Sequence, residues 1–304
     1  MDKIKPFYFS EIHKEYEIEY LNNNNYIFIK DLSYTKNNCE SRILLFQYQN
    51  NKILRGYKDG IIFPKINYFD IKNLHINNKK KKLQEIFDYI CDIFNEYNII
   101  NTKIYQDPYL CIELGYSLFD IINIKNFYSN YELNQYIDYD QSIDLDYIEK
   151  EMESGGTRTI INGYKKNKIN VQIYYGFIDD YIFNNFKNKH IELAGKQTRS
   201  DKCWQLNKDM ILNKEAILVC YENNFVLFHC SEKYCYYGIN ACTKKDKIVS
   251  ILLYEGIQWL LKNNFKFIHF DTFYIHYKDE KMINISKFKK SFCNKIYNQY
   301  YLFK

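Results

Sequence analysis

Short apolar segments separated by turn residues occupy the middle of the second half of the chain. Three of them are Ala216–Tyr221, Phe225–Ser231 and Tyr234–Asn240, with Glu222-Asn-Asn224 and Glu232-Lys233 between them. This spacing is typical of strands that are joined by tight turns. We therefore expect a three-stranded meander in this region.

Helical patterns flank the expected meander on both sides. Cys203, Leu206 and Met210 recur at helical spacing, and Ser200 is expected to cap that helix. The other elements expected in this half are strands at Ile169–Tyr175, Lys266–Phe270 and Tyr297–Phe303, and helices at Asp179–Lys189, Ser250–Lys262 and Met282–Lys295. The strand, helix and strand that follow residue 234 should form a right-handed parallel crossover.

The first half of the chain has a weaker pattern. It predicts a strand at Tyr26–Asp31, a hairpin formed by Ser41–Gln49 and Lys52–Tyr57, a helix at Lys79–Tyr97 and a strand at Asn101–Tyr105. These elements define an α+β class. A boundary near Gln141–Asp146 would give an N-terminal domain at 1–145 and a C-terminal domain at 146–304.

Composition and charge limit the classes of ligand. The 304 residues have 42 basic and 37 acidic side chains, which gives a formal charge of +5. This mild excess is compatible with a ligand that carries phosphate, but it does not indicate binding to DNA. The abundant Asn, Lys, Ile, Tyr and Phe share AT-rich codons, so we attribute them to genome composition.

The nine cysteines include no Cys-x-x-Cys pair. They indicate reduced thiols and no metal site. No apolar run is long enough to span a membrane, and the N-terminal residues lack the apolar core of a signal peptide. We therefore expect a cytoplasmic protein.

The least generic stretch is the one from His190 to Trp204. It places His190, Lys196 and Arg199 in a loop that precedes the helix capped by Ser200. Such a loop is a candidate ligand site, although a solvated turn above a buried Trp204 would have the same sequence.

The second half resembles the GNAT acyltransferases, and more specifically the FemABX-like acyltransferases. The expected order β-α-α-β-β-β-α-β-α-β is that of the GNAT fold. The motif residues are His190, Ala194-Gly-Lys-Gln-Thr-Arg-Ser200, Trp204, the tyrosine run at 234–238, Asp271 and Phe288-Lys-Lys-Ser-Phe292. Lys196 replaces the usual Arg, and Cys293 stands where Gly is common. The resemblance covers residues 155–304 well and implies two tandem GNAT-like domains.

The resemblance implies an acyl-coenzyme A donor, most plausibly acetyl-coenzyme A. Its pantetheine arm would lie between the strands Tyr234–Asn240 and Lys266–Asp271, which should splay apart. Its diphosphate would lie at the start of the following helix, near Asn240 and the three lysines Lys244, Lys245 and Lys247. The usual Gly-rich loop of GNAT enzymes is missing here.

Three residues are candidates for acid–base chemistry. Asp271 follows a parallel strand and could accept the proton of the attacking amine. Tyr237 could donate to the oxyanion or the leaving thiolate, and only one of Tyr236 and Tyr237 can do so, because they point to opposite faces of a strand. His190 is the third candidate. No nucleophilic Ser or Cys stands out, so direct transfer is expected.

The expected acceptor is a small amine, most plausibly an amino sugar carried on a nucleotide. Arg199, Lys196 and Arg158 could hold its phosphates, while Trp204 packs under the loop. Two alternatives remain open. FemABX relatives include tRNA-dependent aminoacyl transferases, which the small charge and the lack of a helical arm disfavour. A GNAT-like module that binds without catalysis would also fit the missing Gly-rich loop.

Overall fold

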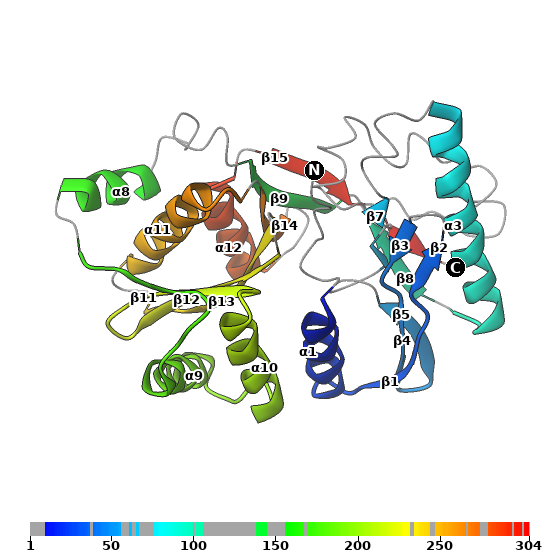
Figure 1. The fold of residues 1–304 in the computed structure, drawn as a ribbon, viewed down its shortest axis with the longest axis horizontal. Helices are drawn as coiled ribbons and strands as arrows, with labels where there is room; N and C mark the ends of the chain where they lie inside the picture. Colours follow the sequence, from blue (N-terminus) through cyan, green and yellow to red (C-terminus); the bar gives the residue numbers. More distant parts are fainter. Residues whose placement is uncertain are drawn as a thin grey trace. The chain divides into compact units, whose positions relative to one another are not determined.

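The computed structural model divides into two compact units, whose elements are labelled in Figure 1. The first unit comprises residues 1–3, 21–139 and 297–304, and the second comprises residues 4–20 and 140–296. The residues that the structure describes are 10–36, 39–55, 61–62, 65–66, 76–99, 101–105, 138–144, 156–166, 169–231, 234–243, 247–265, 267–273, 279–293, 295–299 and 301–303.

Each unit includes a segment from the opposite end of the sequence. Most of helix α1 (Glu11–Asn22) belongs to the second unit, whereas strand β16 (Tyr301–Phe303) pairs with β8 (Asn101–Tyr105) in the first unit. The division at residues 145 and 146 stays a prediction about domains. The predicted division places α1 in the N-terminal domain and β16 in the C-terminal domain, because a sequence pattern does not show which distant segment a helix or strand packs against.

The first unit is built on a sheet in the order β1-β4-β5-β8-β16, with β6 also paired to β8. The bounds of its strands are β1 Tyr26–Asp31, β4 Leu44–Tyr48, β5 Asn51–Arg55 and β6 Ile61–Ile62. A smaller sheet contains β2 (Tyr34–Lys36), β3 (Cys39–Ser41) and β7 (Lys65–Ile66). The long helix is α3 (Ile76–Glu96). The predicted hairpin, helix and strand are therefore present.

The second unit is built on a seven-stranded sheet in the order β10-β11-β12-β13-β14-β9-β15. The bounds are β10 Gln172–Tyr174, β11 Ala216–Tyr221, β12 Asn224–Cys230, β13 Tyr234–Ala241, β14 Phe267–Phe273, β9 Asp138–Asp144 and β15 Lys295–Gln299. Strands β11, β12 and β13 form the predicted antiparallel meander. Strand β14 is parallel to β13, as a crossover requires.

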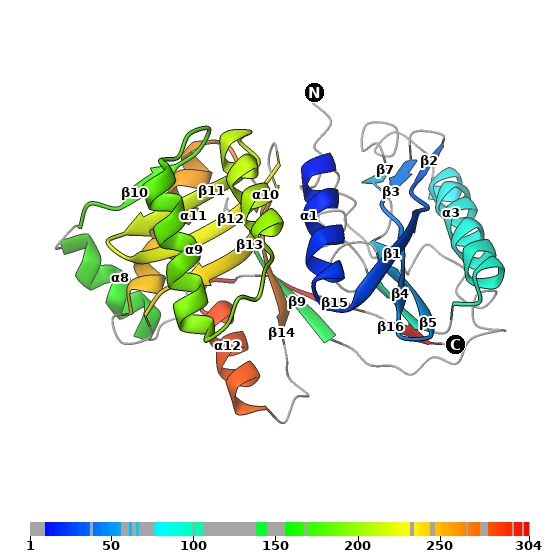
Figure 2. The same ribbon diagram turned by 90° about the horizontal axis from the view of Figure 1, so that it is seen from below.

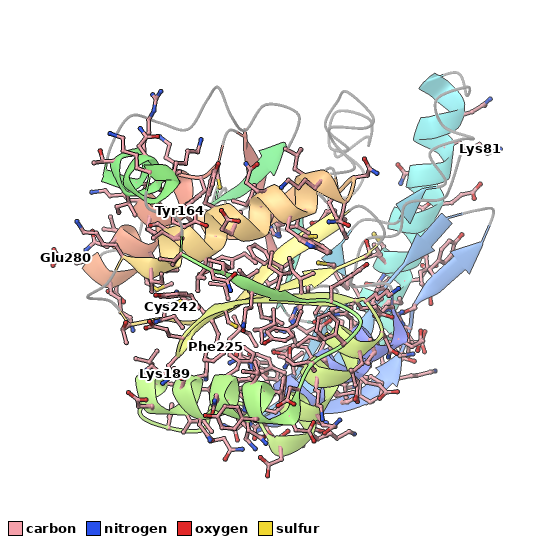
Figure 3. The ribbon with its side chains drawn as sticks, turned by 60° about the vertical axis from the view of Figure 1, so that its left-hand side comes forward. Lys81, Tyr164, Lys189, Phe225, Cys242 and Glu280 are labelled. Atoms are coloured by element: carbon pink, nitrogen blue, oxygen red, sulfur yellow. The ribbon has the colours of Figure 1, made fainter. Side chains whose placement is uncertain are left out.

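Helices cover both faces of this sheet (Figures 1 and 2). Helices α9 (Asp180–Ala194) and α10 (Asp201–Leu212) cover one face. Helices α8 (Gly156–Lys166), α11 (Ile248–Lys262) and α12 (Glu280–Lys290) cover the other. Figure 3 shows Phe225 in the layer between the sheet and α9, where its ring lies 5.6 Å from that of Phe186. The burial of both faces explains why the central strands read as continuous apolar runs.

Two expectations from the sequence were wrong in detail, and one helix was not expected. Helix α9 continues to Ala194, so His190 lies on a helix and not in a loop. The last predicted helix ends at Lys290, and strand β15 begins at Lys295. Strand β9 covers part of the boundary region near Gln141–Asp146, and the boundary itself stays a prediction. Helix α1 was not expected, since its sequence has little apolar periodicity.

The predicted α+β class is confirmed, whereas the tandem repetition of a GNAT-like domain stays a prediction. In the described part of the chain, no helix is long and apolar enough to cross a membrane.

Candidate functional site

Strands β13 and β14 pair only at their first residues. The parallel register joins Tyr234 to Phe267, Cys235 to Ile268 and Tyr236 to His269, and it ends there. Both strands continue beyond this last pair, β13 to Ala241 and β14 to Phe273. The two strands therefore part toward their carboxyl ends, which is the edge of an α/β sheet where ligands bind.

A bulge at Gly238 lies immediately beyond this point. In the pairing of β12 with β13, Phe228 faces Tyr237 and Leu227 faces Ile239, so Gly238 is the extra residue. A Cβ atom at Gly238 would lie 3.2 Å from the Nδ1 and Cε1 atoms of His229. Glycine is favoured here because the main chain passes so close to this imidazole.

The bulge changes which residues face each helical layer. Before it, Cys235 and Tyr237 lie in the apolar cluster beneath α11. After it, Ile239 and Ala241 lie in the cluster beneath α9 and α10. The prediction that Tyr236 and Tyr237 point to opposite faces is therefore confirmed, because Tyr236 contacts His229 on the face of α10.

Tyr237 lies on the α11 face, beside the parted strands. Its ring centroid is 5.9 Å from that of Phe228 and 5.2 Å from that of Phe270, and the Nζ atom of Lys289 lies 5.9 Å from it. Burial is the main cause that raises the pKa of Tyr237 above its usual value. The hydroxyl group stays protonated at neutral pH and can act as a hydrogen-bond donor.

The residues predicted to bind a donor phosphate lie around the start of α11. Lys247 has a left-handed backbone (φ 51°) and is exposed, and no hydrogen bond from a described side chain caps the helix. Asn240 is exposed, and its Oδ1 atom accepts from the main-chain N–H of Cys242. Lys244 and Lys245 lie outside the described residues. The N-terminus of an α-helix favours an anion.

Arg199 lies in a cage of aromatic side chains. Its Nε atom donates to the hydroxyl of Tyr16 at 3.0 Å, and its Nη1 atom lies 3.1 Å from Nε2 of His190. The guanidinium carbon lies 5.5 Å from the ring of Tyr20 and 5.8 Å from that of Trp204. Among the described residues, no carboxylate forms an ion pair with Arg199, and no hydrogen bond involves its Nη2 atom. A cation with this environment is suited to an anionic ligand.

The contact with Arg199 defines which ring nitrogen of His190 has the proton. Because a guanidinium only donates, Nε2 of His190 must accept, and the proton of the neutral ring is then on Nδ1. Burial, and then the charge of Arg199, lower the pKa of His190 to about 4. The Nε2 lone pair is therefore engaged, and His190 as a catalytic base stays a prediction.

Capping residues and packing fix the geometry around Arg199. Gly195, with φ 68°, ends α9, and the Oγ atom of Ser200 accepts from the N–H of Cys203 to begin α10, as predicted. Ser200 also donates to Glu19 of α1 at 2.7 Å. Trp204 is buried against Phe186, which agrees with its predicted position beneath the loop.

The other predicted site residues are not gathered around Arg199. Lys196 is exposed in the connection between α9 and α10. Arg158 is exposed on α8, which packs on the α11 face of the sheet, so Arg158 and Arg199 lie on opposite faces. Asp271 lies in β14 two residues after His269, beyond the last pair with β13, and its side chain is outside the described set.

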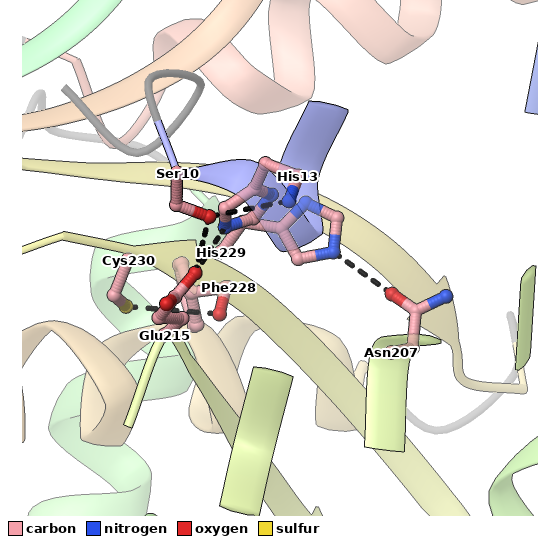
Figure 4. Close-up of polar contacts among 7 residues, drawn as sticks. All are labelled: Ser10, His13, Asn207, Glu215, Phe228, His229 and Cys230. Carbon is pink, nitrogen blue, oxygen red and sulfur yellow. Dashed lines mark hydrogen bonds and ion pairs between the residues drawn. The ribbon is translucent and has the colours of Figure 1, made fainter. Parts of the chain in front are cut away.

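A group of polar residues, of which the sequence analysis considered only Tyr236 for the chemistry, lies on the α10 face of the sheet. The described residues of this group are Ser10, His13, Asn207, Glu215, His229, Tyr236 and His269. Figure 4 shows the imidazoles of His13 and His229 beside each other, and their ring centroids are 5.1 Å apart. Nε2 of His229 lies 2.9 Å from Oδ1 of Asn207. The sequence signal that could have identified this group is a polar residue within an apolar strand, as at His229 and His269.

Contacts with Ser10 and Glu215 anchor the start of α1 near this group. Ser10 donates to a carboxylate oxygen of Glu215 and accepts from the main-chain N–H of His13. Nε2 of His13 lies 4.0 Å from the same carboxylate. Burial lowers the pKa of His13 to about 3, partly offset by the main-chain carbonyl of Glu215. His13 is therefore neutral at neutral pH.

Comparison with known proteins gives a fold but no sequence family. No family model and no curated protein sequence matches the chain. The fold is similar to that of FemX, with a TM-score of 0.59 and 9% identity over 94% of this chain and 90% of that one. It is also similar to L-PGS from Bacillus licheniformis, with a TM-score of 0.54 and 11% identity over 93% and 85% of the two chains.

A third similar structure is the C-terminal domain of a candidate lysylphosphatidylglycerol synthetase from Agrobacterium fabrum. Its TM-score is 0.55, with 9% identity over 96% of this chain and 90% of that one. The chain therefore has the FemABX-like acyltransferase fold that its motifs predicted. At these identities the likeness concerns the fold alone.

Proposed function

We propose that the protein is an acyltransferase that moves an acyl group from an activated donor to an amine by direct attack. The observation that carries this proposal is the parting of β13 and β14 after Tyr236 and His269, next to the bulge at Gly238. An extended donor arm can hydrogen-bond to the strand edges that this parting leaves. The acyl carbon would then lie near the bulge, between the two helical layers.

Coenzyme A is the donor that this geometry favours. The strands part toward the N-terminus of α11, where Lys247 is exposed and no described side chain caps the helix. A diphosphate there would gain from the helix dipole and from Lys244, Lys245 and Asn240. Acetyl-coenzyme A is the simplest donor of this class. We propose no metal in this reaction.

An aminoacyl donor is the second candidate, and the comparisons favour it. One structure with this fold comes from a protein named as a lysylphosphatidylglycerol synthetase, and FemX also has the fold. The chemistry at the acyl carbon would be the same, since an amine or hydroxyl attacks an activated carbonyl. In that case the cations near α11 would meet the phosphates of a tRNA end.

The acceptor is proposed to bind on the face covered by α1 and α10. Arg199, which has no carboxylate partner among the described residues, would hold an anionic group of the acceptor, with Lys196 nearby in the chain. A nucleotide-linked amino sugar has both the amine and the phosphates that this requires. Arg158, on the opposite face, would contact another part of the ligands. Asp271 and Tyr237 would handle protons at the parted strands, with His190 as a third candidate.

Two donors offered in parallel test the proposal. Thermal unfolding is measured with acetyl-coenzyme A and with lysyl-tRNA, since a ligand at about 100 times its Kd should stabilise the protein by about 2.7 kcal/mol. Transfer is then measured with amino-sugar nucleotides and with phosphatidylglycerol vesicles. Thiol release with the first pair supports the coenzyme A proposal, and lysyl-lipid formation supports the aminoacyl one. If neither donor stabilises the protein or reacts, a non-catalytic binding module is the correct interpretation.

A further inference from the structure

Two cysteines face each other across the β12–β13 hairpin of the second unit. The register pairs Cys230 directly with Cys235. The S–H group of Cys235 donates to the Sγ atom of Cys230, and the two sulfur atoms are 3.1 Å apart. Cys230 in turn donates to the main-chain carbonyl of Phe228 at 3.7 Å, the contact drawn in Figure 4. Both side chains are free thiols in the structure, so two sulfur atoms that can be oxidised lie in direct contact.

The backbone around the two thiols has the geometry that a disulfide needs. The N–H of Cys230 donates to the carbonyl of Glu215, toward β11, while Ser231 donates to Tyr234 at the next rung of the hairpin. Cys230 and Cys235 are therefore a non-hydrogen-bonded pair, whose Cα atoms are typically about 4.5 Å apart. A disulfide requires about 4.4–6.8 Å between Cα atoms. The strands can stay in place while the sulfur atoms approach each other by about 1 Å.

The pair lies where β13 loses one of its two neighbouring strands. Cys235 pairs with Ile268 of β14, and the pairing with β14 ends one residue later, at Tyr236 and His269. Beyond that rung, the described pairs of β13 are with β12 alone, as far as Ala241. A covalent bond at Cys235 would therefore attach β13 to β12 just before the segment that is paired on one side only.

Burial limits which oxidants can react with these thiols. Both side chains have no exposed surface and belong to the apolar cluster beneath α11. Burial, followed by the contact with Cys230, raises the pKa of Cys235 well above its usual value. Cys235 thus keeps its proton, so Cys230 is the sulfur that reacts first. The reaction should be slow and should favour a small, uncharged oxidant, because the thiolate is the reactive form and these thiols are buried.

We propose that Cys230 and Cys235 are a modification site that forms a reversible disulfide on exposure to a peroxide. Sγ of Cys230 attacks one oxygen of hydrogen peroxide, the O–O bond breaks, and the thiol proton leaves with the other oxygen as water. The product is a sulfenic acid. Sγ of Cys235 then attacks the sulfenic sulfur, the S–O bond breaks, and a second water leaves with the proton of Cys235. The two sulfur atoms are oxidised and the peroxide is reduced.

The disulfide should stabilise the second unit. A bond between residues 230 and 235 restricts the unfolded chain, whereas the folded strands already hold the two cysteines side by side. The closed loop is short, so the gain should be at the low end of the usual range for disulfides. This inference goes beyond the function proposed above, because it holds whether or not the protein transfers an acyl group.

Peptide mapping of the full chain tests the bond directly. Trypsin cleaves after Lys233, so the two cysteines fall in separate peptides, 215–233 and 234–244. Protein treated with hydrogen peroxide and then alkylated should give these two peptides linked, and dithiothreitol should separate them. Each peptide has a second cysteine, Cys220 or Cys242, so the double variant Cys220→Ala/Cys242→Ala is mapped in parallel and should give the same link.

Several results of this mapping would overturn the proposal. One is alkylation of both Cys230 and Cys235 in peroxide-treated wild-type protein. Another is a link that fragmentation assigns to Cys220 or Cys242, and a third is sulfinic acid at Cys230 with Cys235 still free. The fragmentation of wild-type peptides decides the pairing by itself if the double variant does not fold.

Urea denaturation tests the expected stabilisation. Peroxide should raise the urea midpoint of the wild-type protein, and dithiothreitol should reverse the shift. Cys242→Ala keeps the pair and should respond in the same way, whereas Cys235→Ala should not respond. An equal shift in Cys235→Ala, or no shift in wild-type protein that contains the linked peptide, would contradict the stabilising role. If Cys235→Ala does not fold, the wild-type shift must rise in step with the amount of linked peptide.

Neither measurement uses an acyl donor. Absence of the linked peptide would therefore overturn this inference and leave the proposed acyl transfer standing. Absence of transfer from either donor would overturn the proposed function and leave the disulfide standing.

Discussion

The Nε atom of Arg199 donates a hydrogen bond to the hydroxyl oxygen of Tyr16 across 3.0 Å, although the two residues are 183 positions apart. Tyr16 lies on α1 and Arg199 lies just before α10. This bond, together with the one from Ser200 to Glu19, fixes the N-terminal helix against the rest of the second unit. Residues from the start of the chain thus complete the surroundings of the proposed acceptor site.

Tyr16→Phe should destabilise the second unit. The change removes a hydrogen bond to a charged group in a half-buried position, so we expect a loss of about 1.5–3 kcal/mol in unfolding free energy. Urea denaturation measures it. Tyr181→Phe is the matched control, because Tyr181 is 71% exposed, and it should change stability by less than about 0.5 kcal/mol. Equal losses of unfolding free energy in the two variants would show that the hydrogen bond between Tyr16 and Arg199 contributes nothing to stability.

Arg199→Lys should weaken binding of an anionic acceptor while leaving the protein folded. Lysine has a single ammonium group and cannot present the planar fork whose separate nitrogens contact Tyr16 and His190. We expect the acceptor KM to rise by about tenfold or more, with little change in the donor KM. Steady-state kinetics with each substrate varied in turn measure this. An unchanged acceptor KM would make Arg199 a purely structural residue.

Trp204→Ala should destabilise the whole second unit. The indole is 1% exposed, and its ring centroid lies 5.3 Å from those of both Phe186 and His190. Loss of so large a buried ring should cost about 3–5 kcal/mol in unfolding free energy. Leu212→Ala at a 42% exposed position of the same helix should cost far less. Urea denaturation measures both losses, and similar urea midpoints for the two variants would contradict the buried packing of Trp204.

Neutralising the lysines near α11 should affect the donor more than the turnover. We expect Gln at Lys244, Lys245 and Lys247 together to raise the KM for acetyl-coenzyme A by about tenfold or more, because the diphosphate would lose charge-assisted contacts. Gln at Lys79, Lys80 and Lys81 of α3 removes the same charge elsewhere and should leave this constant unchanged. If both triple variants behave alike, the donor diphosphate does not bind at α11.

Stability should fall in mild acid because the pKa values of three histidines, His13, His190 and His229, are lowered in the folded protein. The pKa values of His13 and His190 are lowered to about 3 and about 4, against an ordinary value near 6.5 in the unfolded chain. The unfolded state therefore binds more protons below pH 6.5, so unfolding free energy decreases as pH falls from about 6.5 to about 4. The slope reaches at most about 1.4 kcal/mol per pH unit for each histidine.

Urea midpoints measured from pH 7.5 to pH 4.5 check this dependence, and His190→Gln should reduce its slope. A slope that the variant leaves unchanged would mean that other groups cause the acid sensitivity.

Much of the second unit follows from local patterns. The apolar strands β11, β12 and β13, the cap at Ser200 and the apolar helix after Lys247 depend on residues that lie close in sequence. The order of these elements and the residues at 190–204 and 234–238 also predicted the FemABX-like fold. Local propensity, capping and apolar period act over a few residues, so a single sequence reveals them.

The site required long-range packing that no local pattern contains. Tyr16 and His13 reach the second unit because α1 packs there, and His229, Tyr236 and His269 align because three strands share one register. The sequence singled out His190, yet the structure shows its Nε2 lone pair engaged by Arg199. Burial and long-range contacts decide whether such a residue has a structural role or belongs to a site. The local sequence around a polar residue in an apolar segment is the same in both cases.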